Sequence, residues 1–547
     1  MKERITYILA EGEAGVNPAT IEVTPDSLKL PGLRAAKEWR ITLSTRDLPQ
    51  SLRNVLKTVH ELHIRWASLH QENTTPPFSS RTPPGLHALY APLRSDRSNN
   101  ASHSAPLCDE IKYIFGPELR CGKTEEAFTR QDILSERFAM SPAYQYYQQL
   151  PLINNLVDYI SANYCSGTKS ASSCTDRVQS LQQASFLDFD YDAISQSIVV
   201  TAVWPPTRHS SMDRKRSAND RVEIGILNRE KATEEEQLSL GGFLTVLGDD
   251  DEPKATLFSF PSRHHQLPSS GPESLSFDTS FKQPTGLHPT LQLTFDRNSL
   301  EPPNPSCALH TYLTLPSTLF IDRYQLSDSL FLKSQNLVSL RSLNGERDLE
   351  APDWVVRKWG AAALFELAVP EDDQTSNGKP WTVSIPTHLR YIPPKSAANA
   401  SSMYPEYLAA AYDTLDDVPG KRTVSIPYPV VFWACPADTG LKMATNPFDR
   451  VNLGYDGLFG PKTLFWHIQS SAATTSVNSQ RLEVLLDAPV LNMDQTAWVD
   501  IGTGLAVFLG FAWVCWKLFI GYTTKESTTG TKKTSSDGAS SGKRKKQ

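Results

Sequence analysis

The hydrophobic positions of this 547-residue chain form many short runs and one long run near the C-terminus. Most short runs alternate apolar and polar residues or are rich in β-branched and aromatic side chains, as strands of packed antiparallel sheets are. Such runs occur near Ile5, Trp39, His63, Val199, Leu291, Ala308, Trp381 and Thr423. The 39 prolines suit turns and edge strands better than long helices. The pattern predicts a mainly β region, antiparallel and sandwich-like, with some helix.

Helical patterns are fewer, and they are interrupted by breakers. The clearest covers Tyr144–Tyr164, where Pro151 has to kink or end the helix. Stretches rich in Pro and Ser at 74–106 and 262–289 are typical of loops or linkers. We therefore expect a domain boundary near residue 285.

The long apolar run, Ile501–Tyr522, contains a single charge, Lys517. As a helix it extends over roughly 33 Å, enough to cross a bilayer core of about 27 Å. Trp498 and Tyr522 lie near its ends, where aromatic rings settle at head-group depth. The alternative, a buried core helix, fits less well because a polar tail follows at once. The run predicts one transmembrane helix.

The flanks of this helix indicate its orientation. From Lys517 onward the chain carries a net charge of about +6, whereas the whole chain has −6, so the part before the helix is near −12. Basic flanks stay cytosolic, which predicts a lumenal body and a cytosolic tail. The N-terminus has no signal-peptide pattern. This conflicts with a lumenal body unless the C-terminal helix itself directs translocation.

The predicted organisation has four parts. These are a mixed β N-terminal region with helices and Pro/Ser-rich loops at 1–284, a β domain at 285–500, the transmembrane helix at 501–522 and a basic tail at 523–547. Basic faces that suit nucleic acid are not expected in so acidic a body. We therefore expect the chain to associate with a membrane and not with nucleic acid.

The tail ends in KRKKQ, with Lys545 third and Lys543 fifth from the end. This arrangement resembles the dilysine retrieval signal of endoplasmic reticulum (ER) proteins, and a nuclear-localisation or lipid-binding basic patch is the alternative. Glycosylation sequons stand at Asn73, Asn100 and Asn399, a number near chance for so Ser/Thr-rich a chain. They allow lumenal exposure without demonstrating it.

Six cysteines lie outside the apolar run: Cys108, Cys121, Cys165, Cys174, Cys307 and Cys435. An oxidising lumen could join them in fifteen ways, and free buried thiols are an equal alternative. Proximity in sequence favours Cys108 with Cys121 and Cys165 with Cys174.

Three stretches contain residue types that occur in phosphate-binding or metal-binding sites. Ile111–Thr124 ends in Gly-Lys-Thr after a strand-like run, but its glycine spacing is one residue too long for a phosphate loop. Asp188, Asp190 and Asp192 would share one face of a strand and could offer oxygens to a hard cation, or simply form an exposed strand face. His264 and His265 are expected in a loop, because further ligands at zinc-like spacing are missing. We expect no catalytic residues, no metal and no cofactor.

The apolar run carries Gly502, Ala506 and Gly510 at intervals of four, so the three lie along one helix face. Small residues let a neighbouring helix approach closely. The alternative is ordinary membrane-helix composition. We expect this face to contact a membrane partner.

From about residue 285 to 436 the chain resembles the PIG-X family, including its longer fungal form, the Pbn (protease B non-derepressible) proteins. The matching segments, in order, are LPSTLFIDRYQL (Leu315–Leu326), DLEAPDW (Asp348–Trp354), SIPTHLRYIPP (Ser384–Pro394) and YPVVFWACP (Tyr428–Pro436). The long N-terminal extension and the missing signal peptide are features of the fungal branch. The resemblance does not indicate what the extension does.

The resemblance implies a non-catalytic ER subunit that stabilises a multi-span catalytic subunit, PIG-M. That enzyme adds the first mannose to glycosylphosphatidylinositol (GPI) precursors. The family is also linked to folding or stability of other ER proteins, so a general lumenal chaperone-like factor is the alternative. A third hypothesis is a lumenal enzyme that uses Asp188, Asp190 and Asp192.

Overall fold

The computed structural model divides the chain into two compact units, residues 1–393 with 400–490, called the body here, and a C-terminal unit with helix α8 (Thr496–Glu526). The described residues are 1–30, 32–70, 75–79, 81–93, 106–131, 144–166, 171–209, 212–215, 220–267, 275–296, 300–370, 380–393, 420–438, 440–448, 454–471, 481–490 and 495–526. Two groups of predicted site residues lie outside them: the sequons at Asn73, Asn100 and Asn399, and the tail lysines Lys543 and Lys545.

The first half of the body forms an eleven-stranded sheet in its described part, in the order β14-β13-β12-β1-β4-β10-β9-β5-β6-β8-β7. Its strands are β1 (Lys2–Leu9), β4 (Leu33–Ser44), β5 (Val59–Ala67), β6 (Gly85–Pro92), β7 (Thr129–Arg130), β8 (Tyr144–Gln148), β9 (Phe186–Asp192), β10 (Ser197–His209), β12 (Arg221–Glu230), β13 (Gln237–Val246) and β14 (Lys254–Pro261). Neighbours are antiparallel except β1 and β12. A small sheet combines β2 (Glu22–Val23), β3 (Ser27–Leu30) and β11 (Met212–Lys215).

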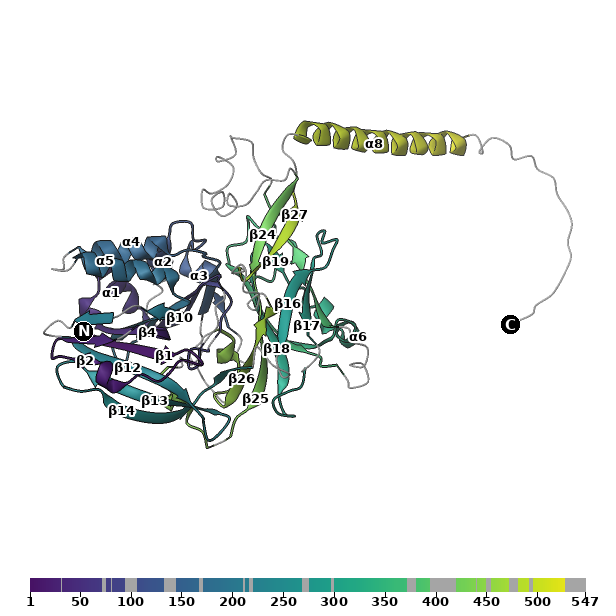
Figure 1. Ribbon diagram of the computed structural model, residues 1–547. Helices are drawn as coiled ribbons and strands as arrows, with labels where there is room; N and C mark the ends of the chain where they lie inside the picture. Colours follow the sequence, from purple (N-terminus) through teal and green to yellow (C-terminus); the bar gives the residue numbers. More distant parts are fainter. Residues whose placement is uncertain are drawn as a thin grey trace, which may run out of the picture. The chain divides into compact units, whose positions relative to one another are not determined.

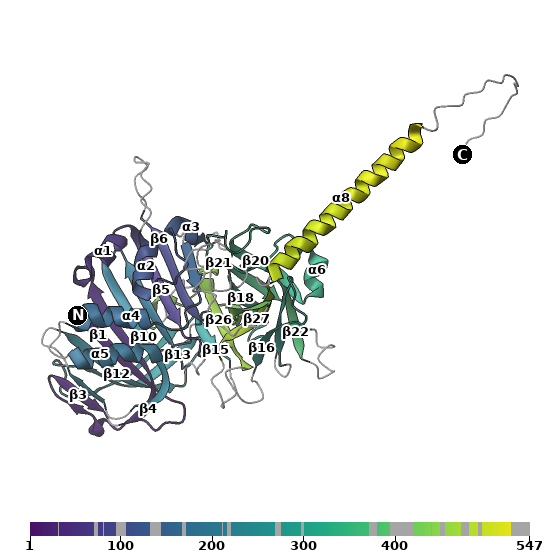
Figure 2. The same cartoon turned by 90° about the horizontal axis from the view of Figure 1, so that it is seen from above.

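Short helices cover one face of this sheet (Figures 1 and 2). They are α1 (Gln50–Leu56), α2 (Leu107–Phe115), α3 (Thr124–Ala127), α4 (Asn154–Ile160) and α5 (Ala171–Gln179). Apolar residues of α2 and α4, such as Ile111 and Leu156, share a core with Trp66 of the sheet. The predicted helix at Tyr144–Tyr164 is wrong in its first part, because Tyr144–Gln148 is strand β8 and the helix begins at Asn154, after Pro151.

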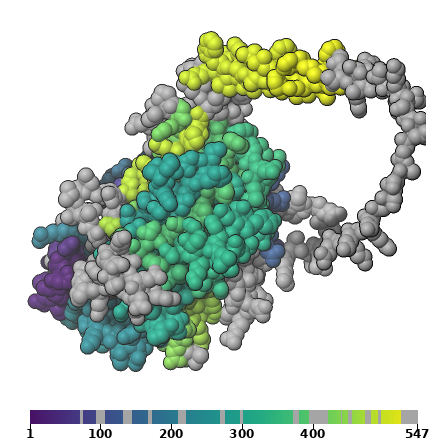
Figure 3. All heavy atoms as spheres, turned by 90° about the vertical axis from the view of Figure 1, so that its right-hand side faces the viewer, coloured from purple at the N-terminus to yellow at the C-terminus, as the bar shows by residue number. Residues whose placement is uncertain are grey.

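The second half forms a nine-stranded sheet in its described part, ordered β20-β21-β18-β25-β26-β16-β17-β22, with β15 also on β26. Its strands are β15 (His264–Gln266), β16 (Ser276–Phe281), β17 (Thr290–Phe295), β18 (Ala308–Pro316), β20 (Leu337–Gly345), β21 (Gly360–Leu367), β22 (Trp381–Pro386), β25 (Val430–Pro436) and β26 (Thr463–Ser470). Helix α6 (Ser329–Ser334) and the strand pairs β19 (Leu319–Phe320) with β23 (His388–Leu389) and β24 (Lys421–Pro427) with β27 (Glu483–Pro489) complete it. Residues of this half form much of the body surface seen in Figure 3.

The two large sheets share one hydrophobic core. Its largest cluster unites Trp66 and Tyr146 of the first sheet with Tyr312, Phe432 and Phe465 of the second. Strands β15 and β16 precede residue 285 yet pair with β26 of the second sheet. The two halves of the body therefore fold as one compact unit.

Three disulfides join described cysteines: Cys108 with Cys121, Cys165 with Cys174, and Cys307 with Cys435. The first two are the pairs that proximity in sequence favoured. The third closes a separation of 128 residues, which no local pattern could indicate.

Helix α8 is long and apolar enough to cross a membrane over Thr496–Tyr522, with a mean hydropathy of 1.8. Its N-terminal end lies five residues before the predicted Ile501. The prediction of a mainly β fold with some helix and a single C-terminal membrane helix is confirmed for the described part of the chain.

Candidate functional site

The three aspartates on β9 lie near the middle of the first sheet. Asp188 faces Arg65 of β5 in register, and the guanidinium Nε and Nη2 donate to its two oxygens at 2.6 Å each. Both side chains are only 4% exposed. Burial acts to lower the pKa of Arg65, but the charge of Asp188 outweighs it and raises that pKa. The pair is a buried, bidentate cross-strand ion pair.

Asp190 and Asp192 are also engaged. Asp190 Oδ1 lies 2.7 Å from Nδ1 of His63. Burial acts to lower the pKa of His63, but the hydrogen bond and charge of Asp190 raise it overall. Asp192 accepts from the backbone N–H groups of Ile194 and Ser195, which lowers its pKa and closes the turn into β10. Asp188 and Asp190 thus make contacts between strands β9 and β5. The described residues contain no group of three or more His, Cys, Asp or Glu side chains suited to a metal ion.

His264 and His265 lie on strand β15, so the predicted loop is wrong. His264 Nδ1 lies 3.0 Å from Nε2 of His467, and His264 Nε2 lies 3.3 Å from Asp456 Oδ2. The Tyr455 hydroxyl is 3.3 Å from the same His467 nitrogen. Burial holds the pKa of His467 well below its usual range, so the ring is neutral. This buried network links β15 to β26, and its members lie too far apart in sequence to be found locally.

A second polar contact joins the two halves of the body. Arg120 Nη1 donates to Asp353 Oδ2 at 3.1 Å and to Ser317 Oγ at 2.9 Å. The Ser317 hydroxyl donates to the other Asp353 oxygen at 2.5 Å. Arg120 belongs to the Gly-Lys-Thr stretch, whose strand-like part is in fact helix α2. That stretch therefore connects the two halves of the body through the contacts of Arg120, and it does not form a phosphate loop.

Three of the segments that resemble the PIG-X family lie together at this contact of Arg120 with Ser317 and Asp353. Strand β19 pairs with β23, and the Arg390 N–H donates to the Thr318 carbonyl at 2.8 Å. The Asp353 N–H donates to the Tyr391 carbonyl at 3.0 Å. Segments 315–326, 348–354 and 384–394 are thus folded side by side.

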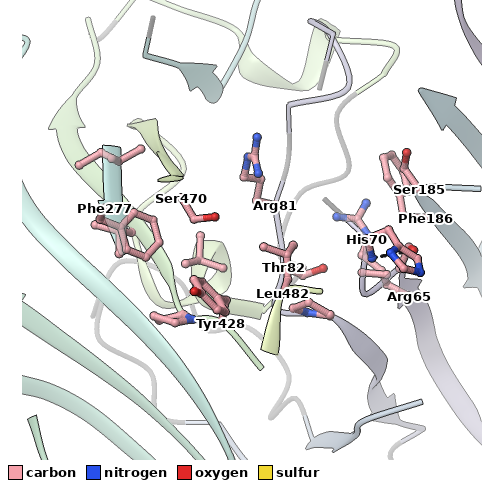
Figure 4. Close-up of a pocket in the computed structure, with 17 residues that line it drawn as sticks. Arg65, His70, Arg81, Thr82, Ser185, Phe186, Phe277, Tyr428, Ser470 and Leu482 are labelled. Atoms are coloured by element: carbon pink, nitrogen blue, oxygen red, sulfur yellow. Dashed lines mark hydrogen bonds between the residues drawn. The ribbon is translucent and has the colours of Figure 1, made fainter. Parts of the chain in front are cut away.

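A cavity of about 100 Å³ lies between the halves of the body (Figure 4). It is lined by Arg65, Arg81 and Phe186 from the first half and by Phe277 and Tyr428 from the second. Burial lowers the pKa of Arg81 to about 10. The volume falls below the range of about 300–1,000 Å³ that is usual for ligand sites, so the cavity suits a few waters or a small ion rather than a sugar donor.

Helix α8 carries Gly502, Ala506 and Gly510 on one continuous helical face, as the spacing predicts. A methyl group added at Gly502 or Gly510 would meet no atom within 4 Å among the described residues. Lys517 Nζ lies 4.9 Å from the Trp513 ring centre, which partly shields its charge. The polar clusters of the body are thus buried in structural contacts, whereas the small residues of α8 have no neighbouring atoms among the described residues.

Comparison with known proteins identifies the chain. Residues 284–519 match the family model described as PIG-X / PBN1. Protein pbn1 of Emericella nidulans is 42% identical over 537 residues, covering 95% of both chains, and protein pbn1 of Neurospora crassa is 40% identical over 522 residues with the same coverage. The chain belongs to the PIG-X/PBN1 family. The predicted resemblance is confirmed.

Membership in the PIG-X/PBN1 family implies an accessory role in GPI-anchor biosynthesis and a GPI mannosyltransferase complex as the partner. The similarity to the fungal proteins extends over both large sheets, well beyond residues 284–519. The first sheet is therefore part of what the fungal members of the PIG-X/PBN1 family share.

Proposed function

We propose that this protein is the non-catalytic subunit that stabilises the multi-span, PIG-M-type catalytic subunit of GPI mannosyltransferase I. The observation that carries the proposal is the similarity to Pbn proteins over 95% of the chain, together with one helix, among the described residues, that is apolar and long enough to cross a membrane. A single helix cannot enclose an intramembrane cleft for a lipid-linked sugar donor. The polar groups that could have suggested chemistry, such as Asp188 and His467, are buried in structural contacts.

The proposed location is the ER membrane, with a lumenal body and a cytosolic tail. Three disulfides support an oxidising compartment on the side of the body. The basic tail supports a cytosolic C-terminus. Retrieval through Lys543 and Lys545, and glycosylation at Asn73, Asn100 and Asn399, remain predictions.

Depletion of this protein should lower the amount of the catalytic subunit and the transfer of the first mannose together. The reason is that an unpartnered multi-span subunit with exposed polar helix faces is removed by quality control. Both quantities can be measured in the same membranes, by immunoblot and by transfer of labelled mannose. Normal abundance of the catalytic subunit with lost transfer would contradict the proposal and favour a direct catalytic role.

The alternative is a general folding factor of the ER lumen. Affinity purification of the full chain from a mild detergent separates the two hypotheses. A mannosyltransferase subunit recovered in near-stoichiometric amount supports the stabilising subunit. Many unrelated clients without such enrichment would support the folding factor.

The double substitution Ala506→Ile with Gly510→Ile should reduce co-purification of the catalytic subunit by roughly tenfold, equivalent to about 1.4 kcal/mol. Two branched side chains on this face of α8 would hold a neighbouring helix away. Gly504→Ile with Cys515→Ile is the matched control, because both positions lie on the opposite side of the helix at 3.6 residues per turn. Equal recovery for both variants, with normal membrane insertion, would mean that α8 is only an anchor.

A further inference from the structure

Two histidines that are 100 residues apart in sequence face each other on the second half of the body. Nδ1 of His288 lies 2.9 Å from Nδ1 of His388, and the two ring planes are nearly perpendicular, at 88°. His288 is exposed and His388 is half-buried, so solvent reaches the contact. Two imidazole nitrogens this close need a proton or a metal ion between them, because two facing lone pairs repel each other.

The backbone fixes the two histidines in this position. The Leu389 N–H donates to the Leu287 carbonyl at 2.9 Å, and the Thr387 N–H donates to the Pro289 carbonyl at 3.0 Å. The histidines lie between these bonds, directly opposite each other in two antiparallel segments, as a pair without backbone hydrogen bonds of its own. Side chains at such a pair are the closest that antiparallel segments provide. The proximity of the two rings therefore follows from the backbone pairing.

The ring of His388 is oriented by its neighbours. Its Nε2 lies 3.3 Å from Oε1 of Gln325, an acceptor, so this nitrogen carries the proton and Nδ1 presents a lone pair toward His288. The ring also stacks on Phe320, with ring centres 5.1 Å apart and planes at 17°. A hydrogen bond at the far nitrogen is how proteins orient a metal-binding imidazole. The Nδ1 atom of His388 is thus held in place as a ligand, and the exposed ring of His288 can turn to meet it.

The geometry suits a divalent metal ion that favours nitrogen ligands. Zinc binds imidazole nitrogens at about 2.0–2.1 Å, and two such nitrogens at a tetrahedral centre are about 3.3–3.4 Å apart. A small turn of the exposed His288 ring opens the observed 2.9 Å to that separation. Zinc, copper and nickel favour imidazole, whereas magnesium and calcium favour oxygen. The described residues add no third His, Cys, Asp or Glu ligand, so water would complete the coordination.

We propose that His288 and His388 form a binding site for a zinc ion, with their two Nδ1 atoms as ligands. The ion takes the place of the proton that lies between the rings. The His288 proton moves from Nδ1 to Nε2 through solvent, and both Nδ1 lone pairs then point to the metal. Both rings stay neutral, as metal-bound imidazoles are.

The zinc ion would connect the segment before β17 with strand β23. Both segments lie within residues 284–519, the part of the chain that matches the family model. Because two protein ligands leave positions for water, the site is open and the ion exchanges with solvent. The inference does not depend on the mannosyltransferase proposal.

The test is the zinc affinity of the full chain, purified in a mild detergent without a polyhistidine tag and freed of metal by a chelator. Competition with a fluorescent zinc indicator at about pH 7.5, above the usual imidazole pKa of about 6.5, gives the dissociation constant. His288→Ala and His388→Ala should each weaken binding by at least about tenfold, because even indirect partners of a metal ligand are worth about 10–100-fold. His70→Ala, at another exposed histidine, is the matched control and should leave the affinity unchanged.

A second measurement needs no substitution. Diethyl pyrocarbonate acylates exposed imidazoles, and peptide mass spectrometry gives the extent at each histidine. Zinc should slow acylation of His288 and His388 several-fold and leave His70 unaffected, and magnesium at the same concentration should protect none of them. Equal acylation of the pair with and without zinc would overturn the proposal, and the contact would then be an ordinary hydrogen bond between two rings. So would a zinc affinity that is the same for the unsubstituted chain and all three variants.

Discussion

Trp359→Ala is expected to lower the free energy of unfolding of the body by about 3–5 kcal/mol. Trp359 is 5% exposed and directly precedes β21 of the second sheet. Its indole N–H donates to the Gln145 carbonyl at 2.9 Å and lies 3.1 Å from Thr129 Oγ1, both in the first sheet, and its ring packs edge-on against Tyr147. Truncation would therefore open a cavity and remove a hydrogen bond where the halves of the body meet.

The measurement is the denaturant or thermal midpoint of the purified full chain. Val355→Ala, four residues earlier, is the control, because this side chain is small and 57% exposed. The control should cost less than about 1 kcal/mol, as surface substitutions usually do. Similar losses for the two variants would mean that the contact between the sheets contributes little to stability.

This contact gives the N-terminal region a physical role that the family resemblance does not supply. The core around Phe432 and Phe465 is completed by Trp66 and Tyr146 from the first sheet. The second sheet alone would expose that apolar surface to water. The first half of the body is therefore a permanent packing partner of the half that matches the family model.

Local patterns in the sequence predicted what depends on local physics. Alternating apolar residues indicate the strands, and an apolar run with a single charge and aromatic residues near its ends indicates α8. The tyrosines and glutamines of Tyr144–Gln148 fit the period of a helix as well as that of a strand, and only their burial between the sheets favours the strand. Two disulfides between near neighbours could be anticipated, whereas Cys307 with Cys435 could not.

The candidate sites show the same limit. The spacing of Asp188, Asp190 and Asp192 correctly placed them on one strand face. It could not show that Arg65 and His63, more than 120 residues earlier, lie on the adjacent strand. There Arg65 pairs with Asp188, and His63 is hydrogen-bonded to Asp190. Whether a carboxylate binds a cation or an arginine is decided by its cross-strand neighbour, and strand order is a tertiary property.

Asp188→Asn is expected to destabilise the body by about 3–5 kcal/mol, because it leaves the buried Arg65 guanidinium without its carboxylate. The change preserves side-chain volume, so a loss of stability reports the charge and not a cavity. The measurements are the denaturant midpoint of the purified protein and its steady-state level in cells. Both should fall, and mannose transfer should fall only in proportion to the protein level.

Two controls separate this structural role from chemistry at the aspartates. Asp192→Asn, which affects only the turn after β9, should cost no more than about 1 kcal/mol. Arg65→Met with Asp188→Leu should recover much of the loss, since removing a buried pair together is often nearly neutral. A lumenal enzyme that used these carboxylates would behave in the opposite way: Asp188→Asn would abolish function at a normal protein level, and the apolar double variant would remain inactive however stable it was.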